Sequence, residues 1–139
     1  LSALLHDVGV TKLPKGLVSY KGRLPDQQYH EYQTHTSIGH DIIKQNENID
    51  SSIAVGILEH HERLDGSGYP RGIASISFEG RLIGLINSFD HLTNSEKTHR
   101  KKRSPFDAML LIKDEVLKEG RFDKAIYKDL CLSLGKNPI

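Results

Sequence analysis

The sequence predicts an all-α domain. Apolar residues recur three and four positions apart in several segments, as they do on the buried face of a helix. Residues 81–92 show this spacing most clearly, because one broad face holds Leu82, Ile83, Leu85, Ile86 and Phe89. Capping residues and glycines stand at the ends of such segments, and strand signals are weak throughout. We therefore expect a bundle of helices joined by loops.

The N-terminal third is expected to hold three helices and one long loop. Residues 1–8 read as a helix that ends at Gly9, a residue able to adopt the left-handed conformation of a helix C-terminus. Residues 9–23 contain glycines and a proline without a sustained period, so they read as the loop. A short helix follows over residues 25–32, and another begins near Thr36.

The remaining helices have clear start signals. Residues that can cap a helix N-terminus precede three further segments, at Asp50, Ser104 and Asp123. The helices are expected over residues 53–62, over residues 105–119, and from residue 124 to a stop before Gly135. Pro105 at the first helical position and Gly120 after the last one strengthen the second of these assignments.

The charge balance argues against a nucleic-acid partner. The 139 residues suit one domain with a real apolar core, and the net charge is +1 with histidines neutral. No global basic field favours DNA. The basic run at residues 97–103 is interpreted as a solvated loop in preference to a phosphate contact.

Cysteine usage and hydropathy indicate the cytoplasm. Cys131 is alone, so no intrachain disulfide can form. No apolar stretch approaches the ~20 residues that span a bilayer, so we expect no direct membrane insertion. The chain opens at Leu1 without an initiator Met and reads as mid-helix. We expect residues 1–139 to be one domain of a longer protein, lacking its N-terminal helices.

Several of the eight histidines gather at predicted helix ends. These are His6, followed by Asp7, then His35 and the pair His60 and His61. Adjacent helical residues point about 100° apart, so His60 and His61 can reach two metal ions. Imidazole and carboxylate ligands suit Fe, Mn, Zn or Ni, and paired cations are a common device for phosphoester hydrolysis. The remaining histidines are interpreted as ordinary hydrogen-bonding residues: His30, His40, His91 and His99.

A loop rich in glycine and proline follows the histidine pair. Gly66, Gly68 and Pro70 shape its backbone. Glu62 and Asp65 either orient ligand imidazoles or cap the loop. Tyr69, at the end of this loop, stacks on a base, donates a hydrogen bond or packs against the helices.

These motifs together resemble those of HD-GYP domains. The matching strings are His6-Asp7-Val8-Gly9, His35-x3-Gly39, His60-His61-Glu62-x2-Asp65-Gly66-x-Gly68-Tyr69-Pro70 and Phe89-Asp90-x-Leu92-Thr93. The match runs over nearly the whole chain and includes Arg121-Phe122-Asp123. The long string around Tyr69 is highly specific, unlike a lone His-Asp pair.

The resemblance implies an HD-superfamily helical bundle with a long metal-site loop and a GYP loop. It implies a bacterial signalling phosphodiesterase that hydrolyses cyclic di-GMP, through a linear dinucleotide, to GMP. The implied metal ligands are His6, Asp7, His35, His60 and His61, with Asp7 bridging two divalent ions, Fe or Mn favoured over Zn or Ni. The implied substrate contacts are Asp65, Tyr69, Asp90, Lys97 and Arg100. A diguanylate cyclase (GGDEF) domain bound through the GYP loop, and a homodimer, are the other expected partners.

Three departures from the family pattern touch the chemistry. Val10 stands where the family has a lysine near the scissile phosphate, and Lys12 replaces it only if the loop turns that side chain inward. Asn87 stands where the family has a metal-binding aspartate, and its amide oxygen can ligate without adding charge. Lys97 and Arg100 restore the family's basic pair only if one residue is inserted.

Three functions are compatible with these residues. The first is a metal-dependent cyclic di-GMP phosphodiesterase. The second is a degenerate domain that binds cyclic di-GMP or a partner protein without cleavage, which the departures at Val10 and Asn87 favour. The third is another HD-type phosphohydrolase acting on a nucleotide, which the intact Tyr69-Pro70 loop argues against. Retention of all five histidine and aspartate ligands favours the first.

Overall fold

The protein is all-α, as predicted. The computed structural model describes residues 1–94 and 102–135, and these contain helices and no strand. In chain order the elements are α1 (Ser2–Leu5), the 3-10 helix η1 (Val8–Lys12), α2 (Lys15–Val18), α3 (Asp26–Gln33), α4 (His35–Lys44), α5 (Ser51–Glu59), α6 (Phe78–Thr93), α7 (Pro105–Leu117) and α8 (Lys124–Ser133). None of these described helices is long and apolar enough to cross a membrane.

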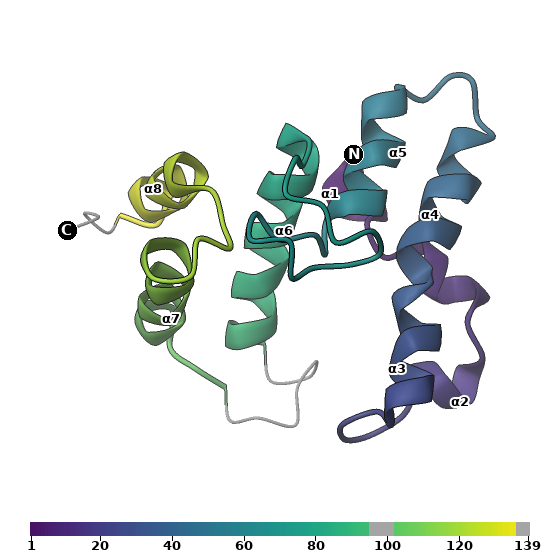
Figure 1. Cartoon of the computed structure of the whole chain (residues 1–139), viewed down its shortest axis with the longest axis horizontal. Coiled ribbons are helices and arrows are strands. Elements are labelled where there is room, and N and C mark those ends of the chain that lie inside the picture. Colours follow the sequence, from purple (N-terminus) through teal and green to yellow (C-terminus); the bar gives the residue numbers. More distant parts are fainter. Residues whose placement is uncertain (95–101, 136–139) are drawn as a thin grey trace.

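Helix α6 lies between two groups of helices (Figure 1). On one side, α7 and α8 pack against it around Leu85, Ile112 and Phe122, a core that also encloses Cys131. On the other side, α5 lies between α6 and α4, and Ile43 and Ile57 form a second core. The loop from α5 to α6 crosses in front of α6, which brings the GYP segment to the junction of the two groups.

The predicted caps are confirmed. The carboxylate of Asp50 accepts a hydrogen bond from the Ser52 amide, and the hydroxyl of Ser104 accepts one from the Asp107 amide. Asp123 accepts bonds from the Ala125 and Ile126 amides at the start of α8. Each cap satisfies backbone donors that the first helical turn leaves open.

The first predicted helix is wrong in its length and in the role given to Gly9. Helix α1 ends at Leu5, and the expected loop of residues 9–23 contains η1 and α2. Gly9 has no positive φ and is not a left-handed cap. The Cα atom of Gly9 lies so close to α4 that a Cβ atom added to it would be 1.9 Å from the carbonyl oxygen of His35. Glycine is required at position 9 because η1 packs backbone to backbone on the start of α4.

Candidate metal centre

The predicted ligands come from three separate helix ends and meet in one place. His6 is the C-cap residue that follows α1, and Asp7 is the N-cap residue that precedes η1. His35 opens α4, while His60 and His61 follow the end of α5 at Glu59 rather than lying inside that helix as predicted. The ligand atoms of Asp7, His35, His60 and His61 all lie within 4.8 Å of one another.

The carboxylate of Asp7 is at the centre of the cluster. Its Oδ1 lies 3.5 Å from Nε2 of His35 and 3.7 Å from Nε2 of His60. Its Oδ2 lies 3.2 Å from Nε2 of His6. One carboxylate therefore faces imidazoles with both of its oxygens, which is the arrangement that a bridging ligand needs.

Backbone carbonyls orient the three imidazoles that face Asp7. Nδ1 of His6 lies 2.8 Å from the carbonyl of Ala3, and Nδ1 of His35 lies 2.6 Å from that of Tyr32. Nδ1 of His60 lies 2.7 Å from the carbonyl of Ile57. A carbonyl oxygen only accepts, so each neutral ring donates from Nδ1 and turns the lone pair of Nε2 toward the cluster. Such partners are typical of metal-ligating histidines.

The cluster fits a divalent metal ion. Within the described residues, Oδ1 of Asp7 and Nε2 of His35 and of His60 are buried without a hydrogen-bond partner. Leaving buried polar atoms unpaired costs about 1–3 kcal/mol each. A cation would satisfy all three atoms at once, and a set of imidazoles and one carboxylate suits a transition metal.

His61 closes the cluster on the side of the GYP loop. Its ring lies 4.2 Å from that of His60, and the ring of Tyr69 stacks on it at 4.5 Å and 17°. Of the roles predicted for Tyr69, the structure shows packing, and the partner is the ring of His61.

Neighbouring groups set the ionisation of the cluster. Burial of the Asp7 carboxyl raises its pKa, but the imidazoles of His6 and His60 outweigh burial and hold that pKa well below its usual range. Burial lowers the pKa of the His61 and His35 imidazoles, and the nearby His60 lowers both further. Near neutral pH the cluster thus combines an anionic Asp7 carboxylate with neutral imidazoles at His35 and His61, the forms that bind a metal.

We expect the metal-free protein to lose stability as the pH is lowered from about pH 8 to about pH 5. Unfolded imidazoles take up protons near pH ~6.5, whereas the pKa of His35 and of His61 is lower in the folded protein. Below that pH the unfolded state binds more protons, so each residue removes at most ~1.4 kcal/mol of the free energy of unfolding per pH unit. Urea denaturation with a chelator measures this slope. His61→Gln should flatten it, and equal slopes in the two proteins would contradict the assignment.

The residues that depart from the family pattern lie in different parts of the chain. Val10 is half-buried in η1 and Lys12 is exposed at the end of that helix. Asn87 is buried on α6, 7% exposed. It lies one turn beyond Gly84, where a Cβ would be 2.7 Å from the carbonyl of His60. The α6 backbone therefore approaches the end of α5 just before Asn87. Lys97 and Arg100 lie outside the described residues.

Buried carboxylates shape the GYP loop. Glu62, 3% exposed, accepts hydrogen bonds from the amides of Arg71 and Ile73, which confirms its loop-capping alternative. Glu59, 5% exposed, accepts from the Ser77 amide and pairs with Arg71.

Asp65 also takes part in the loop. It accepts from the amide and hydroxyl of Ser67 and lies 3.3 Å from Nε of Arg121. The bonds to Ser67 shape the loop itself, and the contact with Arg121 holds the loop against the segment before α8. A substrate contact by Asp65, and one by the half-buried Asp90 of α6, stay predictions.

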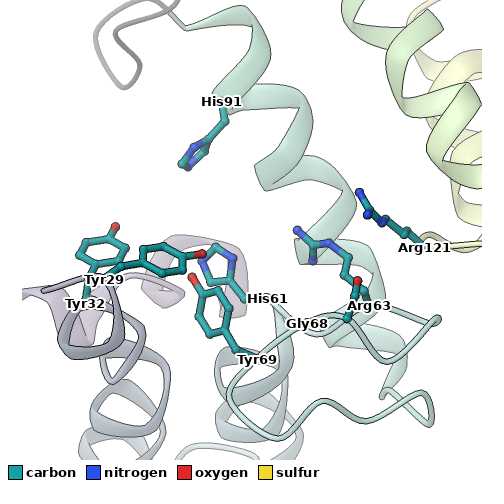
Figure 2. Close-up of a pocket in the computed structure, with 9 residues that line it drawn as sticks. Tyr29, Tyr32, His61, Arg63, Gly68, Tyr69, His91 and Arg121 are labelled. Carbon is teal, nitrogen blue, oxygen red and sulfur yellow. The ribbon is translucent and has the colours of Figure 1, made fainter. Parts of the chain in front are cut away.

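A cavity of about 490 Å³ opens beside His61 and Tyr69 (Figure 2). Tyr29 and Tyr32 of α3 form one side of it, and Arg63 and Arg121 lie opposite. His91 of α6 also lines the space. Aromatic rings and guanidinium groups around one cavity suit a ligand that carries bases and phosphates.

Sequence reasoning missed four of these cavity residues. His91 was interpreted as an ordinary histidine, although it lies one helical turn after Asn87. Tyr32 precedes His35 by three residues, and its ring lies 4.9 Å from that imidazole. Tyr29 precedes Tyr32 by one turn, and Arg63 follows the histidine pair directly. Helical spacing from a predicted ligand was the signal that could have found the first three.

Comparison with known proteins places the chain in a family. The chain belongs to the HD domain family, whose model matches residues 1–126, and it is an HD-GYP-type domain. It is 26% identical over 141 residues to a cyclic di-GMP phosphodiesterase of Pseudomonas aeruginosa, covering 100% of this chain and 33% of that protein. It is 33% identical over 100 residues to the cyclic di-GMP phosphodiesterase response regulator RpfG of Xanthomonas campestris, covering 68% and 26%.

A third relative has a different named substrate. The chain is 31% identical over 129 residues to the 3'3'-cGAMP-specific phosphodiesterase 1 of Vibrio cholerae, covering 91% of this chain and 29% of that protein. The chain thus spans a third or less of the length of these three relatives.

Proposed function

We propose that this domain is a metal-dependent phosphodiesterase that hydrolyses cyclic di-GMP, through a linear dinucleotide, to GMP. The observation that carries the proposal is the cluster of buried atoms of Asp7, His35 and His60 that lack hydrogen-bond partners within the described residues. The cluster adjoins a cavity with aromatic and cationic walls. Relatives that act on cyclic di-GMP support the substrate.

In this proposal His6, Asp7, His35, His60 and His61 hold two divalent ions, Fe or Mn in preference to Zn or Ni, with Asp7 between them. Asn87, buried close to where α6 approaches His60, is the proposed neutral ligand. Divalent ions held there would polarise the phosphoryl oxygens and supply an activated water. The carbonyls of Ala3, Tyr32 and Ile57 keep the ligand imidazoles in position.

The surrounding residues bind and orient the substrate. The stacked rings of Tyr69 and His61 form a flat wall beside the reacting phosphate. Arg63, held by the carbonyl of Glu62 and by the face of the Phe122 ring, presents positive charge to the phosphodiester side of the cavity. Roles for Lys12, Asp65, Asp90, Lys97 and Arg100 stay predictions, as do a GGDEF partner, a homodimer and a cytoplasmic location.

One residue favours the alternative function, in which the domain binds cyclic di-GMP without cleaving it. Val10, on the short helix η1 that follows Asp7, has no group that can donate to a phosphate oxygen. A cavity with intact walls would still hold the dinucleotide. Product analysis separates the two functions.

We expect the protein loaded with Mn²⁺ or Fe²⁺ to convert cyclic di-GMP to the linear dinucleotide and then to GMP. Chromatographic separation of the nucleotides measures the conversion, and a chelator should stop it. 3'3'-cGAMP serves as the comparison substrate. Cyclic di-GMP that binds but is recovered intact in the presence of either metal would favour the binding-only function.

A further inference from the structure

A second cavity adjoins the tyrosines of α3. It has a volume of about 470 Å³ and is lined by the segment that leads into α3, including Arg23, Leu24 and Asp26. Tyr29 and Tyr32 line both this cavity and the one beside His61. The two tyrosines therefore form a wall that both cavities share.

The shared wall of Tyr29 and Tyr32 is close to the metal cluster. The ring of Tyr32 lies 4.9 Å from the ring of His35, and the ring of Tyr29 lies 6.3 Å from that of Tyr69. A ligand whose phosphodiester faces His35 can therefore extend past the tyrosines into either cavity. A dinucleotide carries a base on each side of its phosphodiester linkages, which matches two cavities that share one aromatic wall.

The polar groups of the second cavity are complementary to guanine. Arg23 is exposed and has no ion pair with any side chain of residues 1–94 or 102–135, so its guanidinium is available for a ligand. A guanidinium donates two hydrogen bonds to O6 and N7 of guanine, whereas adenine presents a donor in place of O6. The carboxylate of Asp26 is an acceptor for the N–H groups on the other edge of guanine. The face of a tyrosine ring stacks on any base, so Arg23 and Asp26 supply the selectivity for guanine.

We propose that the second cavity binds one guanine base of the cyclic dinucleotide, with Tyr29 stacking on the base and Arg23 contacting its O6 and N7 edge. Arg23 is then a specificity-determining residue. The inference rests on the proposed function for its ligand, and it adds the place where one guanine base binds and the residue that recognises it.

Calorimetric titration of the protein with cyclic di-GMP tests this, in the presence of a chelator that prevents turnover. Arg23→Ala should raise the Kd roughly 10-fold, because one bidentate contact to guanine is lost. The matched control is Lys21→Ala, which removes an exposed cation two residues away that does not line the cavity. Cyclic di-AMP should bind the parent more weakly, and Arg23→Ala should reduce the preference for cyclic di-GMP by a similar factor.

Two further variants test the stacking. Tyr29→Leu should weaken binding and Tyr29→Phe should retain it, since only the aromatic face is needed. An unchanged Kd in Arg23→Ala, an unchanged preference between the two dinucleotides, or no binding by the parent would overturn the inference. Binding that depends on Arg23, with no hydrolysis after a metal is added, would contradict the proposed function and leave the guanine site standing.

Discussion

Replacing Asp7 with alanine is expected to abolish hydrolysis of cyclic di-GMP, with a loss of more than roughly 100-fold. Asp7 is the carboxylate whose two oxygens face the imidazoles of His6, His35 and His60. Its removal takes away the negative charge that holds cations among neutral rings. Initial rates of product formation at saturating Mn²⁺ measure the loss.

The matched control for Asp7→Ala is His30→Ala. His30 is exposed on α3, and its Nδ1 lies 3.1 Å from Oε1 of Gln33, away from the cluster. This variant should keep the parent rate. Circular dichroism should show the same helical content in all three proteins. Hydrolysis by Asp7→Ala at the parent rate would show that the cluster is not the reaction centre.

Replacing Gly9 with alanine is expected to lower the free energy of unfolding by ~3 kcal/mol and to weaken metal binding. A Cβ at this position would lie 1.9 Å from the carbonyl of His35 and 2.6 Å from the amide nitrogen of Gly39. Both neighbours are backbone atoms of α4, so relief requires η1 and α4 to separate. Such a separation would move Asp7 away from His35.

The control for Gly9→Ala is Gly16→Ala. A Cβ at Gly16, in α2, would meet no atom within 4 Å. This variant should stay within roughly 0.5 kcal/mol of the parent. Urea denaturation and calorimetric titration with Mn²⁺ measure the two effects. Equal stability of the Gly9 and Gly16 variants would contradict the close packing of η1 on α4.

Local sequence signals predicted the longer helices well. The caps at Asp50, Ser104 and Asp123 depend on residues within three positions, so they can be recognised without any tertiary information. The ligand histidines were recognisable because they stand at predicted helix ends and in the motifs that resemble those of HD-GYP domains. Their convergence on Asp7 follows from the packing of α4 on η1 and of α5 on α4.

The features that were missed depend on packing between distant segments. Gly9 has the same local surroundings as a helix-ending glycine, and only the approach of His35 explains it. Helices as short as η1 and α2 bury too little surface to produce a clear apolar period. The cavity wall joins Tyr29 to His91, which are 62 residues apart in the sequence, so no local pattern could have grouped them.

The metal content of the protein tests the central claim most directly. After equilibration with Mn²⁺ or Fe²⁺ and removal of free ions, elemental analysis should find at least one bound ion per chain, and two if the cluster is binuclear. His30→Ala should retain the bound metal, whereas His60→Ala should lose it, because Nε2 of His60 faces the Asp7 carboxylate. A parent protein that retains no metal under these conditions would contradict the assignment of the cluster as a metal centre.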